Sequence, residues 1–421
     1  TQFIAEGGYW GHNYLSLAFP VKVPAYGYAA YTVVEESSEP ARGELGFITY
    51  KHHCFYGAEE RRPEGIENKF VRLEIDPKTG GISRLLDKRS GLELVSPSNP
   101  APAFEFGMER PIGMSAWCVG HDAVIEPPRL KSVTKKFQDW WSSSTKPYKL
   151  GCELQFVFRE SKATILYELH DDDPSVYVKF NCEWFQRGTK DDGIPFARMA
   201  IPVNLEKPEA TYEIPFGSIR RPSENGMEYP ALQWVKVDGV KAGKKAGLLL
   251  GNDSKYGHSI LGSTLRMTLI RAAYEPDPLP EIGNHEVNMV ILPYAGEMPG
   301  SEAAMNARML NHPLKAVSTD AHKGGLPKTE SFLDVSPANV IVSSIKKAEG
   351  ARGIVVRLYE ADGKDTRAEI ALNTKLLGDV KSAEETDLLE RPAKNGSVKF
   401  AKGKLSVGVP AYGITTVLIR Q

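Results

Sequence analysis

The feature that most constrains this chain is a period-two alternation of apolar and polar residues, broken by turn residues about every ten positions. Residues 71–75 alternate cleanly and meet Asp76-Pro77-Lys78-Thr79-Gly80-Gly81, a strong turn sequence, after which residues 82–86 resume the pattern. Alternation places the apolar side chains on one face of a strand, and a turn of this composition reverses the chain. Residues 67–86 are therefore predicted to form a hairpin.

The same pattern recurs along the chain, and only one segment favours a helix. Further strands are predicted at residues 153–158, 163–168, 176–180, 247–250, 265–270 and 287–292. Residues 301–311 predict a helix, with Ser301 as N-cap, Glu302 in the first turn and Pro313 beyond the end. The sequence therefore indicates an all-β chain of the sandwich type.

A repeated corner suggests the domain boundaries. Val23-Pro24-Ala25-Tyr26-Gly27 and Val409-Pro410-Ala411-Tyr412-Gly413 each lead into a strand that ends a domain. Coincidence between two β-turns is the alternative, since Pro and Gly are common in turns. We predict the closing strands of a truncated small β domain at 1–36, a linker at 37–66, a sandwich at 67–325 and another at 326–421. On this reading a preceding segment is missing.

Composition narrows the partners and the compartment. The 421 residues carry a formal net charge of −1, so clustered positive charge for nucleic acid is not indicated. No apolar run approaches the ~20 residues that span a bilayer, so no membrane partner is expected. Cys54, Cys118, Cys152 and Cys182 are scattered, which suits buried reduced thiols and predicts a cytoplasmic protein without a zinc site in this chain.

Several motifs occur together in a fixed order. They are Glu67-Asn68-Lys69-Phe70-Val71 with the turn at 76–82, Ile214-Pro215-Phe216-Gly217 with residues 230–235, residues 251–257 with 265–271, Pro276-Asp277-Pro278 with Gly283-Asn284-His285-Glu286, and residues 345–349 with 356–360. Across residues 20–421 this ordered set resembles the C-terminal β region of glycoside hydrolase family 38.

The resemblance implies a fold and a reaction. The implied fold is a large antiparallel supersandwich of the galactose mutarotase type, followed by an immunoglobulin-like β-sandwich. The implied parent protein is an α-mannosidase that acts on mannose-containing oligosaccharides with retention, one carboxylate attacking the anomeric carbon and a second carboxyl serving as acid and base. In the family the catalytic residues and a zinc ion lie on an N-terminal β/α barrel. This chain lacks the matching strand–helix alternation.

From this we expect no catalytic residue, no metal ligand and no cofactor in the chain, which alone should be inactive. Its expected partners are a mannose-containing oligosaccharide and its own missing barrel, and a homo-oligomer stays open. One motif departs from the family: relatives have two acidic positions in a tryptophan-containing stretch after an Arg-Pro pair. Here Arg110-Pro111 is followed by residues 113–118 without either acid. A sugar contact from this loop is therefore doubtful.

The loop at 275–286 carries the leading candidates for substrate binding. Proline-rich loops present side chains rigidly, and in the family the matching loop approaches the mannose site, so Asp277 and His285 are expected to bind sugar hydroxyls. The structural alternative is that Asp277 caps a turn and His285 satisfies a backbone group. Tryptophans 140 and 141 offer a stacking platform or, more simply, a core anchor.

Two further segments hold weaker candidates. Asn252 and Asp253 predict an Asx-type turn that brings Tyr256 to a domain face. Arg266 and Arg271 bracket an apolar strand, and a spacing of five predicts opposite faces, with one of them pairing with a carboxylate of the missing barrel.

Two rival functions remain. The same architecture serves stand-alone carbohydrate-binding or sugar-epimerising proteins, for which His285 with Glu281 or Glu286 is the only acid–base combination nearby. A purely structural assembly module is the third reading.

Overall fold

The protein, described by a computed structural model, is built almost entirely from antiparallel strands. The structure describes residues 2–9, 11–34, 44–53, 59–96, 102–137, 147–222, 226–320, 322–350, 352–394 and 396–421. Three predicted features fall outside these ranges: the start of the linker at 35–42, the tryptophans at 140 and 141, and the cysteine at 54. Within the described residues, no helix has the length and apolar character needed to cross a membrane.

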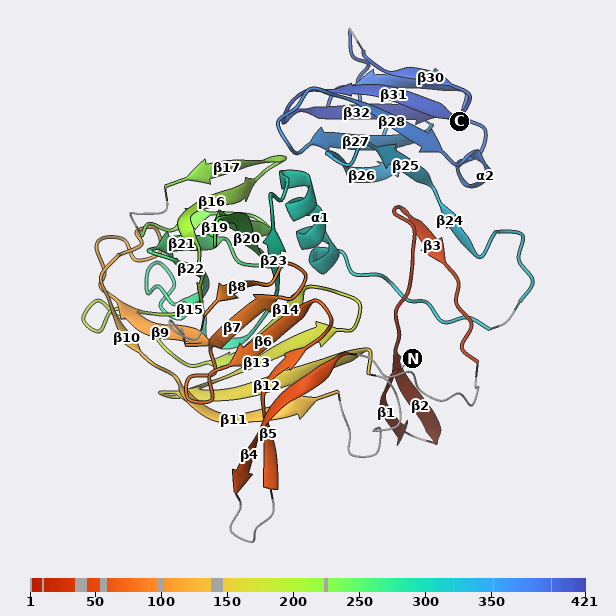
Figure 1. Cartoon of the computed structure of the whole chain (residues 1–421). Helices are drawn as coiled ribbons and strands as arrows, with labels where there is room; N and C mark the ends of the chain where they lie inside the picture. Colours follow the sequence, from red (N-terminus) through yellow and green to blue (C-terminus); the bar gives the residue numbers. More distant parts are fainter. Residues whose placement is uncertain are drawn as a thin grey trace.

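Two large sheets enclose one core and form the supersandwich (Figure 1). The nine-stranded sheet runs in the order β11 (Arg129–Lys136), β12 (Lys149–Phe158), β13 (Ser161–His170), β14 (Val176–Trp184), β23 (Gly283–Ala295), β20 (Lys244–Asn252), β19 (Trp234–Lys241), β16 (Glu206–Ile214) and β17 (Gly217–Arg221). The six-stranded sheet runs β10 (Ala123–Glu126), β9 (Phe104–Glu109), β15 (Ile194–Pro202), β22 (Thr264–Arg271), β21 (Gly257–Leu261) and β18 (Tyr229–Pro230). All six strands predicted in this region are present, each longer than its apolar stretch.

The alternation in the sequence explains the core between these sheets. Strand β14 buries every second side chain, and its neighbour β13 does the same, so each of these strands gives one face to the interior. Phe104 of the six-stranded sheet meets the rings of Phe156 and Phe180 edge-on, at centroid distances of 5.3 and 5.6 Å. Burying a ring of this size contributes about 1.5–3 kcal/mol.

The buried thiols belong to the same core. Cys152 and Cys182 are buried and free, and burial raises the pKa of each to about 12. At neutral pH both are therefore protonated, unreactive thiols.

A third sheet corrects the expected linker. It runs β4 (Gly46–His53), β5 (Glu59–Glu67), β6 (Val71–Ile75), β7 (Ile82–Asp87) and β8 (Leu92–Val95), and it includes the predicted hairpin as β6–β7. Residues 46–53 and 59–67 are thus two paired strands, although they were predicted to lie almost wholly in a linker. The ladder of β4 with β5 and the ladder of β5 with β6 hold them in the sheet.

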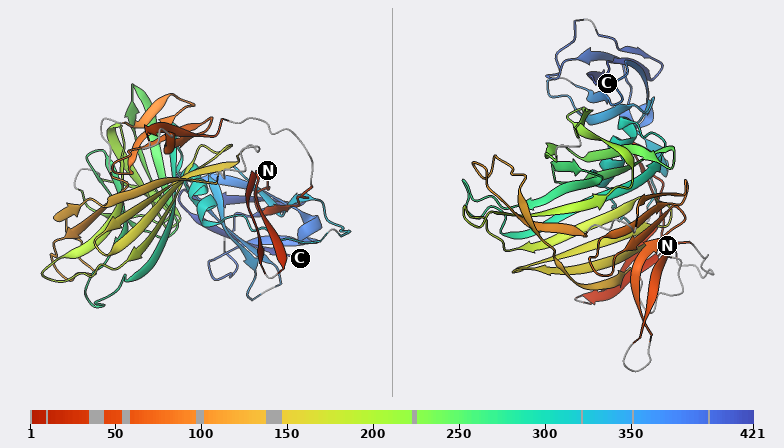
Figure 2. Two further views of the ribbon diagram at one scale, coloured as in Figure 1. Left: turned by 90° about the horizontal axis from the view of Figure 1, so that it is seen from below. Right: turned by 60° about the vertical axis from the view of Figure 1, so that its left-hand side comes forward.

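The C-terminal part is a separate sandwich with its own core (Figures 1 and 2). One four-stranded sheet runs β25 (Leu333–Ser336), β28 (Thr366–Leu372), β31 (Lys404–Val409) and β30 (Lys399–Ala401). The other runs β26 (Val340–Lys347), β27 (Ile354–Glu360), β32 (Ile414–Arg420) and β29 (Ser382–Thr386), with a short helix α2 at Thr374–Leu377.

The N-terminal residues pack on both larger parts. Strands β1 (Gln2–Tyr9) and β2 (His12–Ala18) form a hairpin, and the buried Gln2 accepts hydrogen bonds from the amides of Tyr148 and Lys149 at 2.8 and 2.7 Å. Strand β3 (Gly27–Ala29) pairs with β24 (Thr329–Ser331), the strand that leads into the C-terminal sandwich. The expected unit at 1–36 therefore divides between a hairpin and a strand joined to the last domain.

The repeated corner is real in its geometry. Tyr26 and Tyr412 have φ angles of 53° and 51°, in a region that few non-glycine residues adopt. A strand follows each corner, β3 in the first case and β32 in the second.

Helix α1 (Gly300–Asn311) lies between the supersandwich and the C-terminal sandwich (Figure 1). It confirms the predicted helix but not its cap, because Pro299 is the N-cap residue and Ser301 lies inside the first turn. Asp362 of the C-terminal sandwich caps the helix instead. The amide and the hydroxyl of Ser301 donate hydrogen bonds to its carboxylate at 2.8 and 3.1 Å. The cap comes from 61 residues away along the chain, so local sequence does not show it.

Candidate functional site: a braced pair of loops

Two loops leave the six-stranded sheet at the same end of its strands. Strands β9 and β22 both pair antiparallel with β15, so they run in the same direction and end side by side. Their last residues, Glu109 and Arg271, pair with Ile194 and Phe196 at the start of β15. The loops that follow, residues 110–122 and 272–282, therefore start next to each other. We call them the braced loop pair.

An ion pair at the base of the loops holds them in place. Arg271 Nε and Nη2 donate to the two carboxylate oxygens of Glu109, each at 2.7 Å, and the Glu109 side chain is 4% exposed. The remaining donors reach the first loop, at the carbonyl oxygens of Ser115 (2.7 Å) and Cys118 (2.8 Å). Gly120 N donates to Glu109 at 2.6 Å. Such fork-shaped charged pairs fix direction as well as distance.

A buried hydroxyl joins the first loop to the second. Ser115 is 1% exposed, and its Oγ accepts hydrogen bonds from the amides of Tyr274 at 3.2 Å and Glu275 at 2.9 Å. The proline-rich segment thus begins at a point fixed by the preceding loop.

The outer surface of the pair combines apolar and charged side chains. Its exposed large apolar side chains are those of Ile112, Met114, Trp117, Leu279 and Ile282, and the exposed residues Arg110, His121, Asp122, Glu275 and Asp277 accompany them. Exposed apolar groups gathered on adjacent loops are typical of a surface that contacts a ligand or another domain.

The two leading candidates, Asp277 and His285, make the contacts expected of a turn cap and of a backbone hydrogen bond. Asp277 is exposed, and its Oδ1 accepts the amide of Leu279 at 2.9 Å, as a turn cap does. His285 lies in β23 opposite Cys182, and its Nε2 is 2.6 Å from the carbonyl oxygen of Glu281, so this nitrogen donates. Of the two Asp277 carboxylate oxygens, only Oδ1 has a hydrogen-bond partner among the described residues. Sugar binding at either position stays a prediction.

Asn252, Asp253 and Tyr256 lie on another segment, between β20 and β21. Asn252 is buried, and its Oδ1 accepts the amides of Ser254 and Lys255 at 3.1 and 2.6 Å, which confirms the predicted Asx turn. Asp253 binds the side chain of Asn288 at 2.8 Å, and Tyr256 is 59% exposed.

The two arginines of β22 correct a prediction. They were expected on opposite faces of the strand. The ladder of β22 with β15 contains a bulge, because Ala197 pairs with Ile270 and Arg198 pairs with Thr268, which leaves Leu269 without a partner in β15. The extra residue shifts the alternation by one position, so both arginines lie on the same face. Arg266 pairs with Glu105 at 3.0 Å, as Arg271 does with Glu109. Both carboxylate partners are thus internal, and neither arginine needs one from a missing domain.

These charges line a cavity of about 220 Å³ behind the loops. Glu105 also forms an ion pair with Arg198 at 3.1 Å. Phe196 forms part of the cavity wall. Sequence reasoning missed Glu105, Glu109 and Ser115. A signal for the first two exists, because they occupy alternate positions in an otherwise apolar strand and so must face away from its core side. Among the described residues, no group of three or more His, Cys, Asp or Glu side chains could hold a metal ion.

The comparisons with known proteins agree on one family. Residues 66–279 match the model of the glycosyl hydrolases family 38 C-terminal domain, and residues 339–417 match that of the family 38 C-terminal beta sandwich domain. The first match includes both strands that carry the braced loop pair and ends within its second loop.

Curated relatives cover nearly all of this chain. It is 26% identical over 414 residues to alpha-mannosidase 2C1 of Mus musculus, which corresponds to 95% of this chain and 37% of the relative. It is also 26% identical over 359 residues to an alpha-mannosidase of Saccharomyces cerevisiae, with 77% of this chain and 31% of the relative covered. The chain therefore spans little more than a third of the curated relatives that it matches.

A solved structure shares the fold. An alpha-mannosidase from Enterococcus faecalis V583 superposes with a TM-score of 0.65 at 13% identity, over 85% of this chain and 42% of that one. At this identity the likeness concerns the fold alone.

Proposed function

Because the chain belongs to glycosyl hydrolase family 38, we propose that it is the C-terminal β region of a retaining α-mannosidase acting on α-linked mannose in oligosaccharides. The observation that carries the proposal is the braced loop pair. An ion pair and a buried hydroxyl hold two loops rigidly at one end of the sheet, and their outer surface exposes both apolar and charged side chains. Such rigidity suits loops that wall a substrate site.

The roles within the loops follow from their contacts. Glu109, Arg271 and Ser115 are positioning residues, since they hold backbone; Glu109 and Ser115 are buried and the Arg271 side chain is 13% exposed. Asp277 and His285 are the proposed sugar-binding residues, with Asp277 the more accessible. Asn252 and Asp253 shape a turn instead, which makes them weaker candidates. The two carboxyl groups of a retaining mechanism would come from another part of the protein.

A zinc ion is proposed for a catalytic barrel outside these 421 residues, not for this region. The described residues do not fit one, because they contain no cluster of three or more suitable ligands. The cytoplasmic location inferred from the scattered cysteines stays a prediction.

The 421-residue chain alone is expected to be inactive. Retaining hydrolysis needs two carboxyl groups about 5–5.5 Å apart across the scissile bond, and we assign neither to this chain. The measurement is release of nitrophenol from a nitrophenyl α-mannoside by the purified chain. Turnover that copurifies with the chain and scales with its concentration would contradict this prediction.

The positioning role of Ser115 is tested in a full-length, active α-mannosidase that contains this sequence. Ser115→Ala leaves the amides of Tyr274 and Glu275 unpaired and frees the second loop, so we expect kcat/KM for an aryl α-mannoside to fall by roughly tenfold. Ser344→Ala on β26 of the C-terminal sandwich is the matched control, since the Ser344 hydroxyl has no hydrogen bond to the described residues. Equal activity of the two variants would exclude the positioning role.

The epimerase alternative is less well supported. Its acid–base pair would be His285 with Glu281 or Glu286. The Nε2 of His285 is occupied by a backbone carbonyl, and Glu281 Oε2 lies 3.8 Å from Nδ1. The hydrogen bond from Lys179 lowers the pKa of Glu286, which makes that carboxyl a poor proton donor near neutrality.

A further inference from the structure

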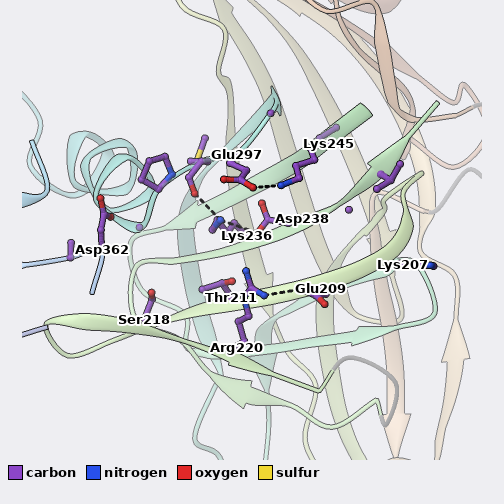
Figure 3. A pocket seen from close by; sticks show the side chains of 18 of the residues that line it. Lys207, Glu209, Thr211, Ser218, Arg220, Lys236, Asp238, Lys245, Glu297 and Asp362 are labelled. Carbon is purple, nitrogen blue, oxygen red and sulfur yellow. Dashed lines mark hydrogen bonds and ion pairs between the residues drawn. The ribbon is translucent and has the colours of Figure 1, made fainter. Parts of the chain in front are cut away.

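A second concave region lies between the supersandwich and the C-terminal sandwich, away from the braced loop pair (Figure 3). Its volume is about 810 Å³, within the range of roughly 300–1,000 Å³ that small-molecule sites occupy. Strands β16, β17, β19 and β20 and the turn before α1 form one wall, and residues 361–364 with Tyr412 form the other. We call it the interdomain cleft. It shares no lining residue with the loop pair.

A buried carboxylate shapes the wall that the C-terminal sandwich provides. Glu360 is fully buried and accepts hydrogen bonds from the amides of Asp362, Gly363 and Lys364, at 2.9, 2.7 and 3.0 Å. It also accepts the amide of Tyr412 at 3.1 Å. One side chain therefore fixes both segments of this wall.

The Tyr412 ring is held in one place. Its backbone has a φ of 51°, and the ring packs so closely on Gly363 that a Cβ there would lie 2.6 Å from it. On the other side the ring comes near Gly217, in the turn between β16 and β17. Half of the side chain, 51%, remains exposed. A fixed, half-exposed aromatic ring can pack against an apolar face of a ligand at little cost in conformational entropy.

The opposite wall is equally ordered. Lys236 is 8% exposed and donates to Asp238 at 2.8 Å and to the carbonyl oxygen of Met298 at 2.7 Å. The hydroxyl of Tyr294 donates to the other oxygen of Asp238 at 2.6 Å. These donors and acceptors are already placed before any ligand arrives.

The charges around the cleft nearly cancel. Five basic and four acidic side chains line it, and Arg220 pairs with Glu209 while Lys245 pairs with Glu297 (Figure 3). A site for a phosphate or a sulfate would carry a clear excess of positive charge. The mixture of donors, acceptors and one aromatic ring instead suits a neutral, polyhydroxylated ligand.

We propose that the interdomain cleft is a second carbohydrate-binding site, which takes a short stretch of neutral glycan with one sugar ring packed on Tyr412. Hydroxyl groups of the glycan meet the polar side chains that line the walls, Thr211 and Ser218 among them. The site holds the glycan and performs no chemistry on it. The proposal does not rest on the role of the braced loop pair.

The test titrates the 421-residue chain with an α-linked mannobiose and follows saturation-transfer NMR and calorimetry. Tyr412→Asn removes the ring while asparagine tolerates a positive φ, and it is expected to weaken binding by roughly tenfold. Tyr412→Phe keeps the ring and should retain binding. Tyr31→Asn is the matched control, since Tyr31 is also 51% exposed but lies outside the cleft.

Melting temperatures accompany each titration. Should Tyr412→Asn fail to fold, Ser218→Phe fills the cleft from β17 without touching the corner and must abolish binding. Three results would overturn the proposal: no mannobiose binding to the unmodified chain, binding that survives both Tyr412→Asn and Ser218→Phe, or displacement of the sugar by inorganic sulfate.

Discussion

At the scale of single residues, buried carboxylates set the shape of the loops in this chain. Glu109 holds the loop after β9 through Gly120 and Arg271, and Glu360 holds two segments of the C-terminal sandwich through four amides. A carboxylate can do this because its two oxygens offer about four acceptor sites. Each loop thereby gains a fixed course without a helix or a strand of its own.

Glu360 should make stability depend on acid pH. Burial tends to raise the pKa of its carboxyl, but hydrogen bonds from Asn339 and from the amides of Lys364, Tyr412 and Asp362 outweigh that effect and leave the pKa lowered. A folded-state pKa below the unfolded value of about 4.3 means that the ionised group stabilises the fold above that pH. This contribution is lost as the pH falls through the lower, folded-state pKa.

The comparison of Glu360→Gln with the unmodified chain isolates this contribution. At pH 7 the variant should lose about 1.5–3 kcal/mol in the free energy of unfolding, since charged hydrogen bonds become neutral ones. Below pH ~4.3 the difference should shrink. Urea titrations across pH measure both. The control is Glu369→Gln, an exposed position on β28. A constant difference at every pH would contradict the assignment.

At the scale of elements, one bulge decides the candidate site. Period-two alternation predicted six strands and the hairpin correctly, and it also predicted Arg266 and Arg271 on opposite faces. The skipped Leu269 reverses that conclusion and brings both arginines to one face. The bulge depends on the pairing of β22 with β15, and β15 lies about 70 residues earlier in the chain. A local sequence pattern therefore cannot predict it. The buried Glu105 and Glu109, by contrast, were readable from alternation within β9.

The Glu109–Arg271 pair should show strong coupling in a double-mutant cycle. Arg271→Met leaves a buried, unpaired carboxylate, and a loss of about 3–5 kcal/mol is expected. In the double variant Glu109→Gln/Arg271→Met the unpaired charge is gone. Its loss in the free energy of unfolding should therefore be smaller than the sum of the losses of the two single variants. Urea unfolding of the four proteins gives the coupling energy. Additive losses would show that the two side chains stabilise their loops independently.

At the scale of the whole molecule, the sequence predicts the fold class better than the boundaries. The all-β architecture and the two sandwiches follow from alternation and turn residues, and the family adds the order of the domains. Strands β4 and β5 were assigned to a linker because their pairing with each other and with β6 is not visible in a local window. The N-terminal residues pair with β24 and contact the supersandwich, and such long-range contacts leave no trace in a local window.

The junction between the two sandwiches carries the last prediction. Helix α1 packs in an apolar cluster shared by both, and its first turn is capped across the junction by Asp362. Asp362→Ala removes an acceptor from the amide and the hydroxyl of Ser301, which should cost about 1 kcal/mol. Because this contact joins two domains, the loss should fall on their docking rather than on either core.

In the unmodified chain we expect one unfolding transition, since each sandwich covers apolar surface of the other. Asp362→Ala should broaden or split it, and limited proteolysis should cut faster between α1 and β24, where the described residues form neither helix nor strand. Asp334→Ala, an exposed position on β25, is the matched control. Unchanged cleavage combined with a lower melting temperature for the whole chain would place the loss inside the C-terminal sandwich. The cap would then serve that domain alone, and the interdomain cleft would depend on the shared apolar cluster for its shape.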